Sequence, residues 1–260
     1  MTEAQYGIIE AEQPSLPTKG LLRVPHRGKT LIVAHPTFGS NTYQGNLAEM
    51  RKHYFHSKEY SDITFKPLTT SQSISALAWN FQNEGKPKIL DPSWLQLGRI
   101  LRTEEGVYIN LPNNVQGKPI IDLDALKKLL DNNTHKIKVG NGHIYLGKED
   151  DFSFAPYETF QTGPQSVEDF KRGGLARLLE GTPDEMAHNL SDIASKDNYP
   201  RGINVWGFDS VQEPRLRVVG LGSGGSAVDD RLGVDGYYWD DDSSGYAFGG
   251  LVSGEASAPK

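Results

Sequence analysis

Six residues near the C-terminus, Gly220-Leu221-Gly222-Ser223-Gly224-Gly225, match the G-x-G-x-x-G pattern of dinucleotide-binding folds. In those folds the glycines let a pyrophosphate approach the N-terminus of a helix. The segment that follows, 226–236, alternates like a strand and contains two further glycines, so a helix is not expected there. Too little chain remains for a βαβ unit with an acidic residue for the ribose. We therefore interpret the motif as a plain loop and expect no cofactor.

Acidic side chains follow these glycines at spacings that suit oxygen ligands of a hard cation such as Ca²⁺. No glutamate closes the segment as an EF-hand loop would require. The preferred interpretation is a solvated acidic turn, with opportunistic cation binding as the alternative, and no dedicated metal site is predicted. The acidic residues are Asp229, Asp230, Asp235, Asp240, Asp241 and Asp242.

Histidines are the remaining candidates for chemistry. His53 and His56 are three residues apart and can share a helix face, but two histidines alone are a weak metal signal. With Tyr54 and Phe55 between them, an exposed helix face is favoured. His35 has no evident carboxylate or nucleophile partner, and the chain has no G-x-S-x-G elbow. We expect His35 to be structural.

The overall composition indicates a globular protein rich in turns. Among 260 residues, 28 glycines and 15 prolines favour short strands and turns over a helical bundle. The absence of cysteine excludes thiol catalysis, disulfides and cysteine-ligated zinc. A net charge of -6 argues against nucleic acid as the main partner. Since no apolar run approaches a membrane-spanning length, no membrane insertion is expected.

The N-terminal segment carries no export signal. Residues 1–13 are acidic and polar and lack the basic and then apolar pattern of a signal peptide. We expect a cytoplasmic protein, or a virion component if the gene is viral. Residues 1–20 are interpreted as a polar arm, and 21–260 as a single domain because no convincing linker interrupts them.

Hydrophobic periodicity places helices in the first three quarters of the chain and a meander of strands at the end, which indicates an α+β fold with helices packed on short antiparallel strands. Predicted helices cover 46–56, 70–83, 122–131, 166–180 with an interruption at Gly173-Gly174, and 183–195. Predicted strands cover 21–24, 30–34, 94–102, 106–111, 142–146, 205–208, 215–219, 232–239 and 246–252.

The tail from Pro214 to Gly254 differs from the rest of the chain because it contains no Lys, Glu, Gln or Met. A segment this long that keeps strand-like alternation is typical of a displayed surface of exchangeable residues. Tyrosine beside small polar residues suits adaptable binding. The expected core anchors of the tail are Leu216, Val218, Leu232, Val234, Tyr246 and Phe248.

The tryptophans are expected to be structural. Trp79, Trp94 and Trp206 lie within apolar patterns and are predicted to be core residues. Trp239 lies between Tyr237-Tyr238 and the run of aspartates, and we expect it to anchor the last strands. The two tyrosines would then flank it at the surface.

Four segments together resemble the C-terminal region of variable proteins diversified by diversity-generating retroelements, particularly those of archaea and archaeal viruses. The resemblance is firmest over about 198–250. It implies a C-type lectin-like fold of the formylglycine-generating enzyme type for 21–260, with a cassette rewritten by error-prone copying of template adenines. The segments are Asn198-Tyr199-Pro200-Arg201-Gly202-Ile203-Asn204-Val205-Trp206-Gly207-Phe208, Leu216-Arg217-Val218, Tyr238-Trp239-Asp240-Asp241-Asp242 and Gly245-Tyr246-Ala247-Phe248-Gly249.

The resemblance also implies which residues face a ligand. Adenine randomisation of AAC or AAT codons does not reach Lys, Glu, Gln, Met or Trp, and the tail from Leu221 to Ser244 fits that set apart from Trp239. The ligand-binding region would span about 214–250. Its expected variable positions are Gly222, Ser223, Gly224, Ser226, Ala227, Val228, Asp235, Tyr237, Tyr238, Asp240 and Ser243.

The expected function is therefore binding of a macromolecular ligand, with a protein favoured, and no catalysis. The alternative is a calcium-dependent carbohydrate-binding lectin, because Gln212-Glu213-Pro214 and Trp239-Asp240-Asp241 faintly match sugar-binding motifs. Arg215 stands where that motif would place a ligating side chain. A hydrolase of related fold is the third hypothesis, and the lack of cysteine weighs against it.

Overall fold

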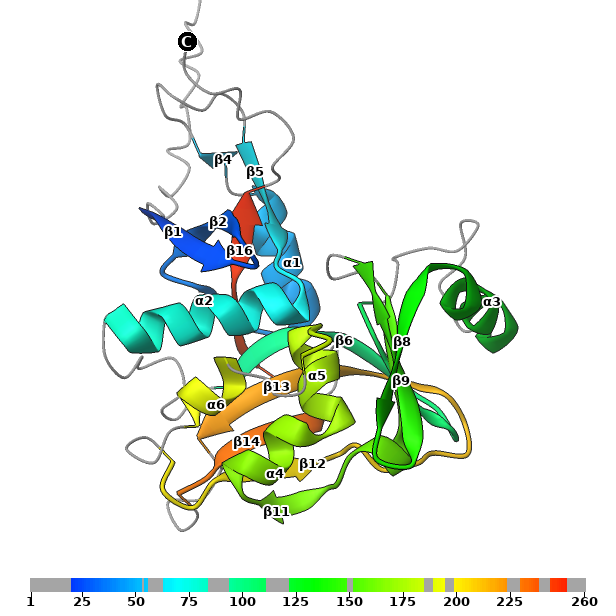
Figure 1. Ribbon diagram of the computed structural model, residues 1–260. Coiled ribbons are helices and arrows are strands. Elements are labelled where there is room, and N and C mark those ends of the chain that lie inside the picture. Colours follow the sequence, from blue (N-terminus) through cyan, green and yellow to red (C-terminus); the bar gives the residue numbers. More distant parts are fainter. Residues whose placement is uncertain are drawn as a thin grey trace, which may run out of the picture.

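A computed structural model describes residues 20–52, 54–55, 63–83, 94–110, 122–148, 152–184, 189–194, 199–223, 230–238 and 244–251. Two sheets organise this part of the chain (Figure 1). The smaller sheet joins the two ends of the described chain, because its last strand lies between strands from the N-terminal region and is antiparallel to both. Its order is β1 (Gly20–His26), β2 (Lys29–His35), β16 (Gly249–Leu251), β5 (Ile63–Pro67) and β4 (Tyr54–Phe55).

The larger sheet is mostly antiparallel and contains the other C-terminal strands. The exceptions are the parallel pair β12 and β14 and a parallel contact between Tyr246 and Leu95. Its order is β11 (Gly163–Gln165), β12 (Ile203–Trp206), β14 (Leu232–Tyr238), β13 (Arg215–Ser223), β6 (Leu95–Arg102), β7 (Gly106–Ile109), β10 (Ser153–Pro156), β9 (Gly142–Gly147) and β8 (Thr134–Val139), with β15 (Gly245–Ala247) joining β6 to β3 (Phe38–Asn41).

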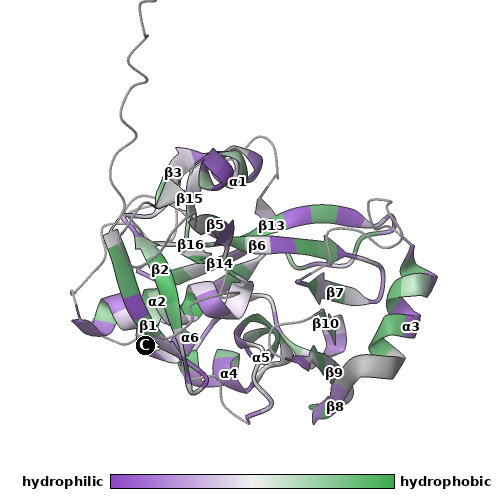
Figure 2. Ribbon diagram, turned by 90° about the horizontal axis from the view of Figure 1, so that it is seen from above, coloured by the Kyte–Doolittle hydropathy of each residue, from purple (hydrophilic) through white to green (hydrophobic). Residues whose placement is uncertain are grey.

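Helices cover these sheets, and their polarity follows their packing. Helix α2 contacts β1 and β6 and also two later helices, and it lies between the sheets in Figure 1. Figure 2 shows polar and apolar residues on different sides of α1 and α3, as expected for helices with one apolar face. The helices are α1 (Tyr43–Lys52), α2 (Thr70–Asn83), α3 (Leu123–Asn133), the 3₁₀ turn η3 (Tyr157–Thr159), α4 (Val167–Arg172), α5 (Gly174–Glu180) and α6 (Asn189–Ile193).

Local chemistry explains several of these boundaries. The turn between β1 and β2 has positive φ at both Arg27 (48°) and Gly28 (73°), the geometry that a two-residue hairpin turn needs. Ser166 caps α4 by accepting a hydrogen bond from the Asp169 N–H at 3.1 Å. Gly181 ends α5 in the left-handed region with φ 60°.

The main core unites α2, α5 and α6 with one face of β6, β12, β13 and β14. The C-terminal strands contribute side chains such as Leu221, Leu232 and Val234, each fully buried. Phe248 joins the same cluster, so the tail is built into the core of the protein rather than attached to it. Burial of these apolar side chains is the main stabilising contribution of the tail.

The α+β class predicted from the sequence is confirmed. Helix α2 has the predicted bounds, and the predicted break between α4 and α5 falls at Gly173. The predicted helix 46–56 instead begins at Tyr43 and ends at Lys52, and the described part of the predicted helix 183–195 contains helix α6 over Asn189–Ile193. Within the described ranges, no helix is both long and apolar enough to cross a membrane.

Two predicted burials are wrong. Trp206 was expected in the core, but 43% of its surface is exposed. Leu216 was expected to anchor the tail, and 37% of its surface is exposed. Both residues lie in the larger sheet, where a strand has one face in the main core and the other turned away from it.

Candidate ligand-binding surface

Strand β14 presents different residues on its two faces. Leu232 and Val234 point into the main core, so alternation turns Gly233 and Asp235 to the opposite face. The neighbouring strands continue this pattern, because Gly222 of β13 pairs with Gly233 and Trp206 of β12 pairs with Asp235. We call this opposite face of β12, β14 and β13 the outer face.

Gly222 is buried beneath a tryptophan on the outer face. A Cβ atom added at Gly222 would lie 2.6 Å from Cε3 of Trp94, closer than any real Cβ contact. Gly222, one of the expected ligand-facing positions, is therefore buried beneath the Trp94 ring. The glycine motif is also not a loop where it is described, since Gly220 to Ser223 continue β13.

The two tryptophans of the outer face lie side by side. The ring centroids of Trp94 and Trp206 are 6.2 Å apart, and the ring planes are tilted by 31°. Trp94 is half-buried, whereas Trp206 is exposed. Both were expected inside the core, and the outer face is where the structure places them instead.

Asp235 is a buried carboxyl group beside these rings. Its side chain accepts a hydrogen bond from the Tyr237 N–H at 2.7 Å. Burial raises the pKa of Asp235 to about 6, while that hydrogen bond and the charge of Arg102 act in the opposite direction. Asp235, a second expected ligand-facing position, is also buried, with 8% of its surface exposed.

Tyr237 is the expected ligand-facing residue that the structure does place at the surface. Half of its surface is exposed, and its ring lies near two guanidinium groups, 5.8 Å from Arg102 Cζ and 5.7 Å from Arg217 Cζ. Arg102 is held in place because its Nη2 and Nε donate to the Asp209 carbonyl oxygen at 2.6 and 3.2 Å. Cation–π contacts of this kind stabilise a ring in one orientation.

For the remaining expected ligand-facing positions, the structure describes no side chain. Ser223 and Tyr238 end β13 and β14, and the structure describes their backbone only. Asp230 is described and exposed. Outside the described residues lie Gly224, Ser226, Ala227, Val228, Asp240 and Ser243, together with His53, His56, Asp229, Trp239, Asp241 and Asp242.

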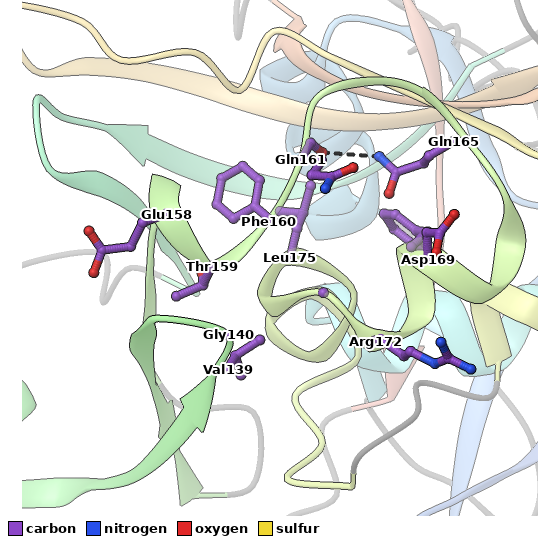
Figure 3. A pocket seen from close by; sticks show the side chains of 12 residues that line it. Val139, Gly140, Glu158, Thr159, Phe160, Gln161, Gln165, Asp169, Arg172 and Leu175 are labelled. Carbon is purple, nitrogen blue, oxygen red and sulfur yellow. Dashed lines mark hydrogen bonds between the residues drawn. The ribbon is translucent and has the colours of Figure 1, made fainter.

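Among the residues that the structure describes, no three His, Asp or Glu side chains are placed to hold a metal ion. A cavity of about 360 Å³ lies between η3, α4 and the β8–β9 turn, with Phe160, Gln161 and Arg172 in its lining (Figure 3). Gln165 Nε2 donates to the Gln161 carbonyl oxygen at 3.0 Å, and none of the expected ligand-facing residues lines this cavity.

A larger cavity of about 520 Å³ lies beside the β1–β2 turn. His26 Nδ1 is 2.9 Å from Ser75 Oγ, and Asn189 Nδ2 donates to the same hydroxyl at 3.3 Å. These bonds tie the hairpin to α2 and α6, because the three residues belong to those three elements. The network is a structural connection that the sequence could not reveal, since its members are far apart in the chain.

The outer face adds two residues that sequence reasoning did not assign to the ligand surface, Trp94 and Trp206, which were expected in the core. Arg102 and Arg217 hold the Tyr237 ring but are themselves buried, with 4% and 6% of their surface exposed. The strand register that pairs Gly222 with Gly233 determines where Trp94 lies, and the sequence alone does not reveal this register.

Comparison of the chain with protein-family models, with curated proteins and with solved structures finds no match.

Proposed function

We propose that this protein binds a macromolecular ligand, and specifically a protein, through a surface in its C-terminal region. One observation supports the location. In the part of the chain that the structure describes, the exposed large apolar side chains are Trp206, Leu216 and Tyr237, and all three belong to the C-terminal strands. Exposed aromatic residues are typical of interaction sites.

The exposed residues of the C-terminal strands favour a protein as the ligand. Tryptophan, tyrosine and arginine are the residue types that most often dominate the binding energy of protein interfaces. Trp206 of β12, Tyr237 of β14 and Arg215 of β13 bring these three types to the exposed parts of neighbouring strands. The proposed activity at this surface is binding without catalysis.

We further propose that retroelement adenine mutagenesis diversifies the region of about 214–250 on a C-type lectin-like scaffold of the formylglycine-generating enzyme type. The α+β architecture supports this, as does the way the C-terminal strands divide their two faces. Leu221, Leu232 and Val234 are fully buried, so the fold is stabilised from one side. Exchange of exposed residues on the other side then costs little stability.

The binding proposal is tested with Tyr237→Ala, alone and with Tyr238→Ala. A phage-displayed random-peptide library is selected on the immobilised full chain, and the enriched peptides are measured against the variants. We expect loss of about tenfold or more in affinity, because truncation of an aromatic hot spot costs about 2 kcal/mol or more. Thermal unfolding should change little.

Lys138→Ala is the control, because Lys138 is exposed on β8, at the edge of the larger sheet far from β12 and β14. Equal loss of binding in Lys138→Ala and Tyr237→Ala, or no loss in either, would reject the proposed surface. Unfolding of the tyrosine variants would show that these residues belong to the core.

A further inference from the structure

The cavity beside the β1–β2 turn brings a serine hydroxyl and an imidazole together. Its volume of about 520 Å³ lies within the range of about 300–1,000 Å³ that small-molecule sites occupy. The described residues of its lining belong to β1, β2, α2, α5 and α6 and to the segments that join them, rather than to the C-terminal strands. His26 and Ser75 are part of this lining, and each has only 7% of its surface exposed. The cavity is therefore the route by which a small molecule reaches either side chain.

The hydroxyl of Ser75 bonds to other elements and not to its own helix. A serine inside a helix commonly bonds back to the carbonyl oxygen one turn earlier. Among the residues that the structure describes, the partners of Ser75 Oγ are instead His26 Nδ1 at 2.9 Å and Asn189 Nδ2 at 3.3 Å. Since an amide nitrogen only donates, the hydroxyl accepts from Asn189 and directs its own hydrogen to His26. His26 Nδ1 is then the acceptor, which is the arrangement of a nucleophile with its general base.

The Asn189 amide is held beside this hydroxyl by the start of α6. Glu180, with 6% of its surface exposed, accepts the N–H of Leu190 at 2.7 Å and the N–H of Asn189 at 3.3 Å through its two carboxylate oxygens. These bonds satisfy the first N–H groups of α6 and fix the backbone of Asn189. The side-chain donor of Asn189 thus stays next to Ser75 Oγ, close to where negative charge develops when that oxygen attacks a carbonyl group.

The rim of the cavity is charged. Arg27 and Lys29 are exposed in its lining, and Arg27 Nη2 donates to the carbonyl oxygens of Glu180 and Gly181, which holds the turn against the end of α5. Asp184 is exposed in the same lining and offsets part of the positive charge. A rim of this kind favours a small polar substrate over one with a long apolar chain.

We infer that this cavity is a hydrolytic site for small carboxylic esters, with Ser75 as the nucleophile, His26 as the general base and Asn189 as the donor to the oxyanion. Ser75 Oγ bonds to the carbonyl carbon of the ester while its proton passes to His26 Nδ1. The bond from this carbon to the leaving alcohol oxygen then breaks, and that oxygen takes the proton from Nδ1. The inference goes beyond the proposed binding function and does not depend on it.

Water completes the reaction by the same route in reverse. Its oxygen bonds to the acyl carbon while one of its protons passes to His26 Nδ1. The bond between the acyl carbon and Ser75 Oγ then breaks, Oγ takes the proton back from Nδ1, and the carboxylic acid leaves. No oxidant, reductant or further reactant is needed, because the two half-reactions together consume one ester and one water.

The first test is covalent labelling of the native full chain with a fluorophosphonate probe, which reacts with activated serine hydroxyls. Peptide mass spectrometry should locate the label at Ser75, and heat-denatured protein and Ser75→Ala should carry none there. His26→Asn should slow labelling by about a hundredfold, because asparagine can accept the Ser75 hydrogen bond but cannot take up the proton. Ser210→Ala is the control and should label like wild type, since the exposed Ser210 donates to the Glu104 carbonyl oxygen and not to a base.

Turnover of p-nitrophenyl acetate is the second test. Ser75→Ala should abolish it, and Asn189→Ala should lower it by about a hundredfold, the usual effect of losing one oxyanion donor. Thermal unfolding of each variant shows whether it is folded. Peptide binding at the C-terminal surface should be the same in Ser75→Ala and wild type, so failure of this inference and failure of the proposed function give different results.

Three outcomes would overturn the inference. They are a native protein that is not labelled at Ser75, equal labelling of native and denatured protein, and turnover that Ser75→Ala leaves unchanged. If Ser75→Ala fails to fold, the position of the label in wild type and the labelling rate of His26→Asn decide. Labelling as fast in His26→Asn as in wild type would show that the bond between His26 and Ser75 only ties the hairpin to α2.

Discussion

The two faces of strand β14 differ in what they bury. Leu232 and Val234 are fully buried against helices and neighbouring strands, and they act as ordinary core residues. Gly233 and Asp235, which alternate with them, lie beneath or beside Trp94, Trp206 and Tyr237. One strand thus stabilises the fold with one face and supports exposed aromatic rings with the other. A surface of this kind can change without loss of the fold, because the two tasks use different side chains.

The comparison predicts the largest loss of stability on the core face. Leu232→Ala should lower the free energy of unfolding by about 2–5 kcal/mol, because it removes buried methyl groups and leaves a cavity. Urea unfolding followed by far-ultraviolet circular dichroism measures this. A change below about 1 kcal/mol would mean that β14 is not anchored by this face.

The next effect concerns Asp235 and pH. The pKa of Asp235 is about 6 in the folded protein and 3.8 for an ordinary aspartate, so the folded state binds the proton more tightly. Stability should therefore fall as pH rises from about 4 to about 6 and remain lower above that range. Since one pKa unit corresponds to about 1.4 kcal/mol, Asp235→Asn should stabilise the protein at pH 8 by up to about 3 kcal/mol.

The pH dependence of Asp235→Asn provides the control. Wild type and variant should have similar stability below about pH 3, where Asp235 is mostly protonated in both the folded and unfolded states. Chemical denaturation across this pH range measures both proteins. A variant that is less stable than wild type at pH 8 would show that the charged form of Asp235 is favoured in the folded protein.

Gly222 and Gly233, which pair beneath the Trp94 ring, predict an intermediate loss of stability that differs between the two positions. Gly222→Ala should cost about 1–3 kcal/mol, because overpacking forces the Trp94 ring to move. Gly233→Ala should cost less, since its Cβ would lie at 3.1 Å rather than 2.6 Å from the ring. Thermal unfolding and the near-ultraviolet circular dichroism of the tryptophans measure both. Equal stability of Gly222→Ala and wild type would show that the position of the Trp94 ring does not require glycine at 222.

The smallest change in stability is expected at the exposed ring. Tyr237→Ala should lower the free energy of unfolding by about 1–2 kcal/mol, because two cation–π contacts are lost while no core packing is removed. Its loss removes cation–π contacts with Arg102 and Arg217, each worth about 0.5–1 kcal/mol at exposed sites. A loss of stability comparable to that of Leu232→Ala would show that Tyr237 is packed as a core residue.

Local patterns in the sequence predicted much of the fold. The spacing of Ile74, Leu77 and Ala78 identified α2 over its full length, and the hairpin of β6 and β7 followed from its turn. Strand β8 was missed because Thr134 follows α3 directly, without a glycine or proline to mark the boundary. Such boundaries depend on tertiary pairing that local patterns do not contain.

The exposure of residues in the C-terminal strands was predicted for Tyr237 but not for Trp206. Tyr237 was expected at the surface and is exposed there, since aromatic residues beside small polar ones indicated display. Gly222 and Trp206 were misplaced for one shared reason. Trp94 is distant from both in the sequence, and only the strand register brings its ring over Gly222 and next to Trp206.

The central claim is that the C-terminal region is a diversified ligand surface on a constant core. The most direct measurement is sequencing of the genomic DNA that flanks the gene. We predict a near-copy of the codons from about Leu216 to Gly249, beside a reverse transcriptase gene. The copies should differ only where the template has adenine, and the codons for Gly222 and Gly233 should not differ. The absence of any such copy would contradict the claim and leave the tail as a fixed structure.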